Sequence, residues 1–352
     1  MASMRGRRQR RRGHGIGWHA VLATVIAAAV AACGSGGAGT QAGPANPAQQ
    51  DYVRVVRELL PSVVQIDAGQ QTGSGVVFDS AGDIVTNAHV VGHARTVEVF
   101  VSATSGPLTA HLVGRFLPDD LAVVRVTAHR SALRPARWAN SDQAQVGQFV
   151  LAMGAPYGLI DSVTQGIVSA TGRTVTGPTI TGQPPMVITD AVQTSAAINP
   201  GNSGGALVLL SGAVLGIPTL AAKDPALGHD VSGIGFAIPS NTVRDIASQL
   251  IRAGHVTRSD RASLQITGST YASKSGSGAG VSVDFALRAG AARAAGIRAG
   301  DVITGLGRTK TSDLAELDYQ LIYYRPGEKA AVHVLRDGRP KVFTVRLGSL
   351  GG

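Results

Sequence analysis

The apolar residues of this chain fall mostly into short runs that are separated by turn residues. Glycine, proline, serine and aspartate punctuate a series of such runs: Val63–Asp67, Gly75–Asp79, Ile84–Asn87, Val97–Val101, Leu121–Val126 and Phe149–Met153. Short apolar runs between tight turns are typical of antiparallel β-structure. We therefore predict a mainly β fold, with an antiparallel barrel or sandwich in this part of the chain.

Two segments at the edges of this β-rich block have the pattern of helices. One is Tyr52–Leu60, which stops at a proline. The other is Asn241–Ala253, where Val243, Ile246 and Leu250 recur at the three- and four-residue spacing of one helix face. We expect the second helix to close a first domain.

A different pattern begins after the polar stretch Gly254–Ser259. Short strands then alternate with the helix-like segments Ala291–Gly296 and Leu314–Tyr323. We place a domain boundary in the polar stretch. This gives a first domain of residues 52–255 and a second, small α+β domain of residues 260–350.

The N-terminus has the order of an export signal. Six arginines between positions 5 and 12 precede a mostly apolar stretch, Ile16–Ala32, which ends in small residues before Cys33. A basic segment, an apolar segment and a small-residue cleavage site together are typical of a secretory signal peptide. A cysteine in that place resembles the lipobox of bacterial lipoproteins, which implies cleavage before Cys33 and a diacylglyceryl thioether on its sulfur.

These features predict a lipoprotein signal peptide at residues 1–32 and a flexible tether at residues 33–51. The folded body is then extracytoplasmic, anchored to the bacterial cell membrane or envelope through a lipidated Cys33. The alternative is an uncleaved signal anchor with an incidental cysteine.

The positive charge of the chain is concentrated at this N-terminus. The net charge is +10, but without the six N-terminal arginines the 32 basic residues fall to 26, against 22 acidic ones. A nucleic-acid-binding protein carries its positive charge on the folded body, so we exclude a nucleic-acid partner. A single cysteine excludes an intrachain disulfide and a cysteine-based cluster, and no His-Glu-x-x-His motif is present, so we predict no metal site.

The sharpest candidate for chemistry is the segment from Asn199 to Gly205, which reads Asn-Pro-Gly-Asn-Ser-Gly-Gly. A nucleophilic serine needs a tight turn that exposes its hydroxyl and leaves backbone N–H groups free for a developing oxyanion. Glycines on both sides of Ser203 allow such a backbone. The same pattern also fits the nucleophile elbow of α/β-hydrolase esterases, but that elbow requires a following helix. Leu207–Leu210 has the pattern of a strand instead.

Two further candidate groups lie upstream, beside apolar strands. His89 follows the strand-like run that ends at Asn87, and Asp119 and Asp120 directly precede Leu121–Val126. Successive residues of a strand point to opposite faces, so only one of the two aspartates can meet the histidine. The pattern alone leaves open which one does.

In chain order, His89, an aspartate and Ser203 resemble the catalytic residues of trypsin-like serine proteases, and more closely those of the HtrA/DegP family. The resemblance rests on these blocks: Gly73–Val77, Asp83–Val90, Gln193–Thr194, Ala196–Pro200, Gly233–Pro239 and, in the second domain, Ala299–Ile303. It implies a double antiparallel β-barrel followed by a PDZ domain.

The role of each residue is implied by this resemblance. His89 would be the general base, Asp120 would orient its imidazole, and Ser203 would be the nucleophile. The N–H groups of Gly201 and Ser203 would form the oxyanion hole. The substrate would bind as an added strand beside Ile234–Phe236. The expected binding residues are Ala197, Ile198, Ile234, Gly235 and Phe236 for the substrate, and Leu264, Gln265 and Ile266 for a PDZ-bound peptide.

Two positions depart from the family pattern. Ser195 stands where the family commonly has aspartate, which leaves the triad complete but alters how the neighbouring loop is held. Gln265 stands where the carboxylate-binding loop usually has glycine, and it lacks the freedom of glycine for close backbone approach. A PDZ domain that only packs and regulates is therefore the alternative to one that captures free C-termini.

The resemblance predicts an envelope serine endopeptidase of protein quality control and stress response. It would act without a cofactor, as a homotrimer, on unfolded or mislocalised proteins. A chaperone or peptide-binding scaffold is the alternative, which the presence of all three triad residues disfavours. No acidic residue lies between Ala191 and Ser203, so the primary pocket is expected to be apolar and to accept Val, Ala, Ile or Leu.

Overall fold

The computed structural model describes residues 47–351, apart from 103, 156–161, 178–185, 200, 224–229 and 273–277. Cys33 and the expected signal peptide lie outside the described residues. The first described element is helix α2 (Pro47–Leu59), which starts five residues before the helix expected from Tyr52. Proline is a favoured first residue of a helix, because its φ is fixed near the helical value. None of the helices in the described part of the chain has the length and apolar character needed to cross a bilayer.

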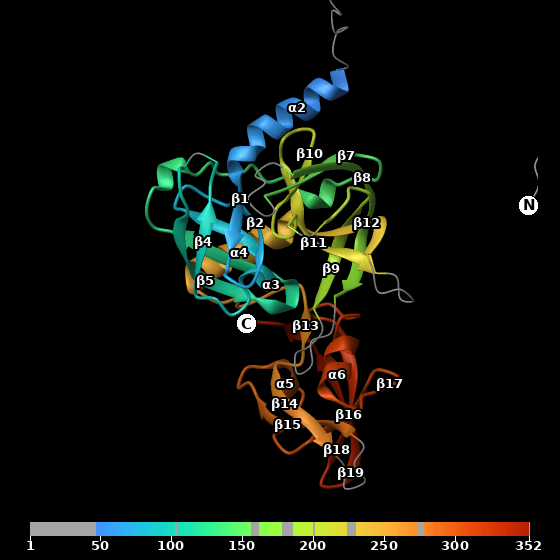
Figure 1. The fold of residues 1–352 in the computed structure, drawn as a ribbon. Coiled ribbons are helices and arrows are strands. Elements are labelled where there is room, and N and C mark those ends of the chain that lie inside the picture. The colour runs from blue at the N-terminus through green and yellow to red at the C-terminus, as the bar shows by residue number, and fades with distance from the viewer. Residues whose placement is uncertain are drawn as a thin grey trace, which may run out of the picture. The chain divides into compact units, whose positions relative to one another are not determined.

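Strands β1 to β6 close into a first antiparallel barrel with the order β1-β2-β3-β6-β5-β4 (Figure 1). Its strands are β1 (Val63–Asp67), β2 (Thr72–Val77), β3 (Asp83–Asn87), β4 (Thr96–Phe100), β5 (Leu108–Phe116) and β6 (Leu121–Val126). The sequence pattern missed β5, because polar residues such as Thr109 and His111 occupy its exposed positions. The short helix α3 (Ala88–Val91) follows β3 directly, and the 3-10 turn η2 (Leu117–Asp119) precedes β6.

Strands β7 to β12 close into a second antiparallel barrel with the order β10-β11-β12-β9-β8-β7. Its strands are β7 (Phe149–Gly154), β8 (Ser162–Thr176), β9 (Val187–Thr194), β10 (Ala206–Leu209), β11 (Val214–Lys223) and β12 (Asp230–Pro239). The prediction of a mainly β, double-barrel fold is confirmed.

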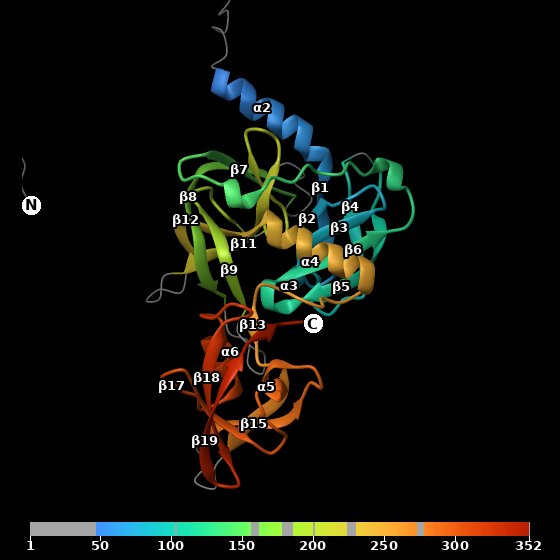
Figure 2. The ribbon, with the colours of Figure 1, turned by 180° about the vertical axis from the view of Figure 1, so that it is seen from behind.

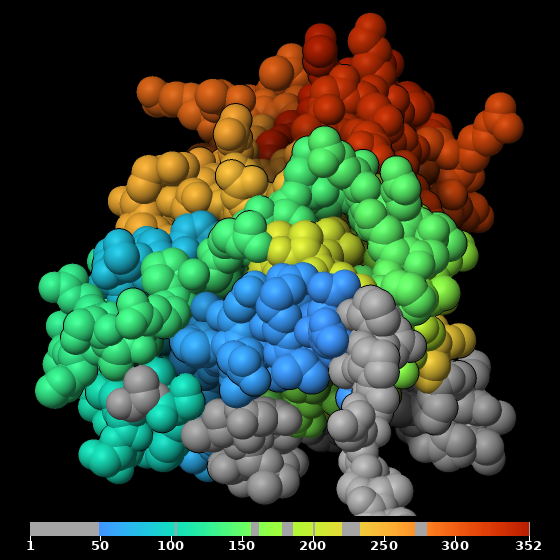
Figure 3. All heavy atoms as spheres, turned by 90° about the horizontal axis from the view of Figure 1, so that it is seen from above, coloured from blue at the N-terminus to red at the C-terminus, as the bar shows by residue number. Residues whose placement is uncertain are grey.

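Helix α4 (Ser240–Ala253) packs its apolar face across both barrels (Figure 2). Val243, Ile246 and Leu250, the residues that predicted this helix, are all buried there. Helix α2 covers the same core from another side: the ring of Tyr52 meets that of Phe149 edge to face, and Arg54 donates a hydrogen bond to the Leu210 carbonyl. Figure 3 shows α2, in blue, flanked by the green and yellow segments of the second barrel.

A third sheet, with the order β14-β15-β16-β18-β19, builds the C-terminal part of the chain. Its elements are β14 (Ile266–Ala272), β15 (Gly278–Ala286), α5 (Ala291–Ala294), β16 (Val302–Leu306), β17 (Thr309–Lys310), α6 (Leu314–Leu321), β18 (Lys329–Arg336) and β19 (Arg339–Arg346). These elements enclose an apolar core of their own, around Val281, Ile303 and Val332. Leu264 and Gln265 precede β14, which begins at Ile266.

The chain leaves α4 and later returns close to that point. β13 (Ala262–Ser263) pairs with β20 (Gly348–Ser349), and the Leu350 N–H donates to the Arg261 carbonyl. Val256 is buried in the apolar core that the barrels share, and Leu350 packs against the same core. The C-terminal sheet is therefore joined to the barrel region both by the segment that enters it and by the one that leaves it.

Candidate active site

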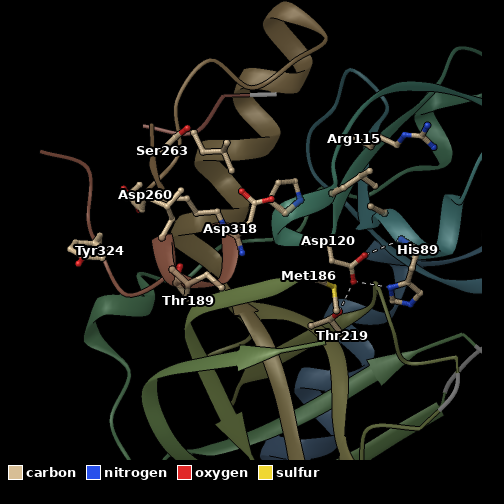
Figure 4. Close-up of a pocket in the computed structure, with 18 of the residues that line it drawn as sticks. His89, Arg115, Asp120, Met186, Thr189, Thr219, Asp260, Ser263, Asp318 and Tyr324 are labelled. Carbon is tan, nitrogen blue, oxygen red and sulfur yellow. Dashed lines mark hydrogen bonds and ion pairs between the residues drawn. The ribbon is translucent and has the colours of Figure 1, made fainter. Parts of the chain in front are cut away.

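The imidazole of His89 is held by the carboxylate of Asp120. His89 Nδ1 lies 2.7 Å from Asp120 Oδ2, and the His89 backbone N–H donates to Asp120 Oδ1 over 2.9 Å. A third donor, the Thr219 hydroxyl, reaches Asp120 Oδ2 at 2.6 Å (Figure 4). The carboxylate fixes a proton on Nδ1, so the lone pair of the neutral ring is on Nε2, where it can accept a proton.

Asp120 is shaped for this task by its backbone as well. It has the left-handed conformation, with φ 52° and ψ 41°, which aspartate tolerates better than most residues. Its carbonyl accepts hydrogen bonds from the Ala88 N–H and the Asn87 side chain, each at 3.0 Å. Asp120 thus binds the start of helix α3 with both its carbonyl and its carboxylate. These bonds fix the position of the His89 backbone.

Asp119 turns away from the histidine into another contact. Its carboxylate lies 2.8 Å from the Arg261 guanidinium, and both side chains are nearly buried, with 6% and 12% of their surface exposed. The approach is an ion pair without the direction of a hydrogen bond. Burial raises the pKa of Asp119 to about 6, although the charge of Arg261 lowers it. Arg261 also donates a hydrogen bond to the Val187 carbonyl in β9.

Ser203 lies in a tight turn that packs against the strand before His89. The turn is closed by hydrogen bonds from the Asn202 N–H to the Asn199 carbonyl and from the Gly205 N–H to the Asn202 carbonyl. Gly204 follows the serine with φ 80°, and a Cβ there would lie 2.1 Å from the Ser74 carbonyl and 2.4 Å from the Thr86 hydroxyl. Only glycine fits this position.

Gly73 lies between the segment that carries the nucleophile and the segment that carries the base. A Cβ on Gly73 would lie 2.6 Å from the side chain of Val90, the neighbour of His89, and 3.2 Å from the Ser203 carbonyl. Within the described residues, the Ser203 hydroxyl and His89 share no hydrogen bond. In structures without substrate such bonds are often long, and they shorten when the reacting complex forms.

Two backbone N–H groups of the turn, those of Gly201 and Ser203, donate to no described residue. Gly201 has φ 102°, a conformation that favours glycine. These are the two groups expected to meet the oxyanion.

The residues expected to bind substrate divide into exposed and buried ones. Ala197 is exposed, whereas Ile198 is buried, and a Cβ on Gly235 would lie 2.3 Å from Ile198. Ile234 and Phe236 are partly buried in β12. Ser195, found in place of the usual aspartate, accepts a hydrogen bond from the Ile167 N–H over 3.0 Å, so the loop before the nucleophile is tied to β8.

The expectation that a substrate strand pairs beside Ile234–Phe236 is wrong. Gly235 and Phe236 already pair with β11 on one side and with β9 on the other, so neither of these two residues has a free edge. A free edge is found on β11 instead. Among the described residues, β11 pairs with β12 as far as Lys223, while its pairing with β10 ends at Gly216 and the Pro218 carbonyl accepts from the Gly204 N–H.

In the C-terminal sheet, Gln265 is strained and tied down. It has φ 57°, the region where glycine is preferred, which costs another residue about 1–2 kcal/mol. Its side-chain oxygen accepts from the Ala291 N–H at 3.0 Å, and its amide donates to the Ser349 carbonyl at 3.1 Å. Its own N–H donates to the Ser263 hydroxyl. Leu264 is buried, and Ile266 is partly buried against the same core.

A cavity of about 590 Å³ lies next to the triad carboxylate (Figure 4). His89, Asp120 and Thr219 line it from the barrels, and Asp318 in helix α6 and Tyr324 after that helix line it as well. Burial raises the pKa of Asp318 to about 6, while Arg261 lowers it. The described residues contain no cluster of three or more histidine, cysteine or acidic side chains that could hold a metal ion.

Sequence reasoning missed Thr219, which donates directly to the triad carboxylate. It lies within an apolar strand, and nothing local distinguishes it from a core threonine. Its partner is 99 positions away in the chain, so only the fold reveals the contact.

Comparison with known proteins gives two family matches. Residues 73–217 match the trypsin-like peptidase domain, and residues 268–347 match the PDZ domain. The chain is 38% identical over 288 residues to the serine protease Do-like HtrA of Lactobacillus helveticus, which covers 78% of this chain and 68% of that protein. It is 39% identical over 275 residues to the periplasmic serine endoprotease DegP of Escherichia coli, which covers 76% of this chain but only 55% of that protein.

Solved structures agree with these matches. The serine endoprotease from Yersinia pestis is similar with a TM-score of 0.54 at 34% identity, over 85% of this chain and 98% of that one. The HtrA-type protease AlgW with a decapeptide is similar with a TM-score of 0.54 at 30% identity, over 85% of this chain and 98% of that one.

Proposed function

Because this chain belongs to the HtrA family of trypsin-like serine proteases, we propose that it is an extracytoplasmic endopeptidase that cleaves unfolded or mislocalised proteins. The observation that carries this proposal is the His89–Asp120 contact at 2.7 Å beside a serine turn in which two N–H groups have no acceptor among the described residues. A base, its orienting acid and an oxyanion site are the parts that acyl transfer needs.

The reaction follows from these positions. The Ser203 hydroxyl attacks the carbonyl carbon of the scissile bond, and His89 accepts its proton at Nε2. The carbonyl oxygen becomes an oxyanion, which the N–H groups of Gly201 and Ser203 stabilise. His89 then gives its proton to the leaving amine, and water hydrolyses the acyl-enzyme with His89 again as the base. Asp120 and Thr219 keep the imidazole in the orientation that both proton transfers require.

The substrate is an extended peptide that pairs with the free edge of β11 near Thr219. This edge is supported by the strand register: among the described residues, β11 has no strand partner on one side beyond Gly216, where the Pro218 carbonyl is bonded to the Gly204 N–H. Strand addition binds backbone groups and so requires an unfolded segment, with little dependence on its sequence. That property suits a protease of quality control.

The proposal includes attachment to the cell envelope and assembly. The order of basic, apolar and small residues before Cys33 supports export and lipidation at that cysteine. The resemblance to the HtrA family supports a homotrimer. The DegP relative is named a periplasmic endoprotease, which supports an extracytoplasmic location for this chain.

Labelling and cleavage together test the proposal. A peptidyl phosphonate should label Ser203 covalently, and the full chain in detergent should cleave unfolded casein. Ser203→Ala should abolish both. Casein cleavage that persists in Ser203→Ala would contradict the proposal, and a labelled serine without any cleavage would favour a peptide-binding scaffold.

A further inference from the structure

Ser74 in β2 is fully buried, and all its polar groups have partners. Its hydroxyl donates to the Gly201 carbonyl over 2.6 Å and accepts from the Ala155 N–H over 2.8 Å. Its N–H donates to the Ser203 carbonyl over 2.9 Å, and its carbonyl accepts from the Thr86 hydroxyl over 2.6 Å. One residue therefore connects four separate segments of the two barrels.

Two of these bonds clamp the nucleophile turn on both sides of Asn202. The carbonyls of Gly201 and Ser203 are held by the hydroxyl and the N–H of the same serine. Gly201 has no Cβ, so its neighbouring peptide planes have more than one accessible orientation. A short hydrogen bond to the Gly201 carbonyl fixes the plane of the Gly201–Asn202 peptide, which lies between the two N–H groups of the oxyanion site. In that orientation the N–H groups of Gly201 and Ser203 stay without partners in the described structure.

The other two bonds extend this clamp to both barrels. Thr86 lies in β3, three residues before His89, and Ala155 follows the end of β7. Gly204 lies against the bond between Ser74 and Thr86, since a Cβ there would meet both the Ser74 carbonyl and the Thr86 hydroxyl. The turn that carries the oxyanion site and the strand that leads to the base therefore share one anchor, with no spare room around it.

We propose that Ser74 is a positioning residue for catalysis, whose hydroxyl holds the Gly201–Asn202 peptide between the two oxyanion N–H groups and so keeps the oxyanion site formed. The inference rests on the proposed protease function. Ser74 does not touch the substrate; it acts through Gly201. Its loss leaves the buried Gly201 carbonyl and Ala155 N–H without a partner, and the turn gains the freedom to rotate its N–H groups away.

The test compares Ser74→Ala with Ser240→Ala in the full chain. Ser240 is the matched control: it is also fully buried, and its hydroxyl donates to the Ala139 carbonyl over 2.9 Å, away from the triad. With a quenched fluorescent peptide, Ser74→Ala should lower kcat about 10- to 100-fold, because a misplaced donor loses much of the 10²- to 10³-fold effect of an oxyanion contact. KM and the pH dependence of kcat should stay unchanged, since His89 and the binding edge are intact.

Two more measurements separate positioning from folding. A peptide boronic acid, which forms a tetrahedral adduct on Ser203, should bind Ser74→Ala more weakly by the same factor as kcat falls. Ser74→Cys, which keeps a weak donor, should be intermediate. Ser240→Ala should keep kcat within twofold of wild type even if its melting temperature falls as much as that of Ser74→Ala.

Three results would overturn the inference. They are a kcat for Ser74→Ala within twofold of wild type, a loss that appears in KM alone, and an equal loss of kcat in Ser240→Ala. A wild-type chain that neither cleaves peptides nor reacts with the phosphonate would overturn the proposed function and this inference together. An active wild type with an equally active Ser74→Ala would overturn this inference alone.

Discussion

At the scale of single residues, Asp119 and Asp120 are neighbouring carboxylates with different tasks. The left-handed backbone at Asp120 directs its side chain to His89 and Thr219, while Asp119 lies against Arg261. The Asp120 carboxylate accepts hydrogen bonds from His89 and Thr219. At Asp119, burial has the largest effect on the pKa and raises it. The backbone conformation at these two residues therefore decides which carboxylate contacts His89 and supports catalysis.

Substitution of each aspartate by asparagine should separate these tasks. Asp120→Asn should lower kcat about 10⁴-fold, because an amide favours the wrong tautomer of the imidazole. Asp119→Asn should keep kcat within about tenfold of wild type. It should lower the melting temperature, because Arg261 is left buried without its charge partner. Steady-state kinetics and thermal unfolding measure the two effects, and an essential Asp119 beside a dispensable Asp120 would reverse the assignment.

The sequence was sufficient for residues whose role is visible in a local motif. Ser203 between glycines, His89 after a strand and an aspartate before another strand could all be identified there. The structure adds that Asp120, and not Asp119, contacts His89. Thr219 and Ser74 could not be assigned a role, because their partners lie 99 and 127 positions away, and only the closed barrels bring them together.

At the scale of elements, apolar periodicity predicted those strands and helices whose buried face is apolar throughout. Helix α4 is the clearest case, since its three spaced apolar residues are all buried. The mistaken substrate edge at β12 has another cause. Which neighbours a strand pairs with depends on barrel closure, and β12 pairs with the preceding strand β11 and also with β9, which ends at Thr194.

The elements around the nucleophile also predict substrate preference. Ala197 and Ile198 before Ser203 and Phe236 in β12 are apolar, and no acidic residue lies between Ala191 and Ser203. Mass spectrometry of peptides from an unfolded protein should show cleavage mainly after Val, Ala, Ile or Leu. The preference should be broad, because one methylene changes binding by only about 1–3 kcal/mol. Cleavage mainly after Lys or Arg would show that a carboxylate reaches the pocket.

Helix α6 should make stability depend on pH through Asp318. Burial raises its pKa to about 6, above the ordinary value of 3.8, so the folded chain keeps a proton that the unfolded chain loses. This contribution to stability is complete below about pH 4 and is lost as pH rises through about 6. Asp318→Asn should therefore gain melting temperature relative to wild type between pH 4 and pH 7. A difference that does not change with pH would contradict this.

At the scale of the whole molecule, the C-terminal sheet has its own core yet is bonded back to the barrels. Val256 and Leu350 pack against the shared barrel core from the entering and leaving segments. The predicted domain boundary in Gly254–Ser259 therefore falls in a stretch that also contributes to the first core. Composition could indicate the change of pattern there, but not this packing.

Truncation tests the independence of the barrels. A chain ending at Ser259 should fold and keep its triad, because all three triad residues lie upstream. A chain ending at Gly254 should melt roughly 5 °C lower than the longer one, since it loses the burial of Val256, worth about 1.5–3 kcal/mol. Circular dichroism of both chains measures this, and complete unfolding of both would refute independent barrels.

Cys33→Ala tests the anchor. Two acyl chains of a diacylglyceryl group hold a protein on a membrane, whereas one chain holds it only marginally. The variant should leave the membrane fraction or accumulate as a heavier precursor. Unchanged membrane retention together with an unchanged mass would contradict lipidation and favour the uncleaved anchor.

The close fit around Gly204 has a consequence for genetics. Every missense change at this codon adds a Cβ, whatever the chemistry of the new side chain, and that carbon would lie 2.1 Å from the Ser74 carbonyl at a φ of 80°. Neither a smaller nor a more similar amino acid exists to replace it. In a saturation library selected for proteolysis, this codon should return glycine alone, so only silent changes can accumulate there.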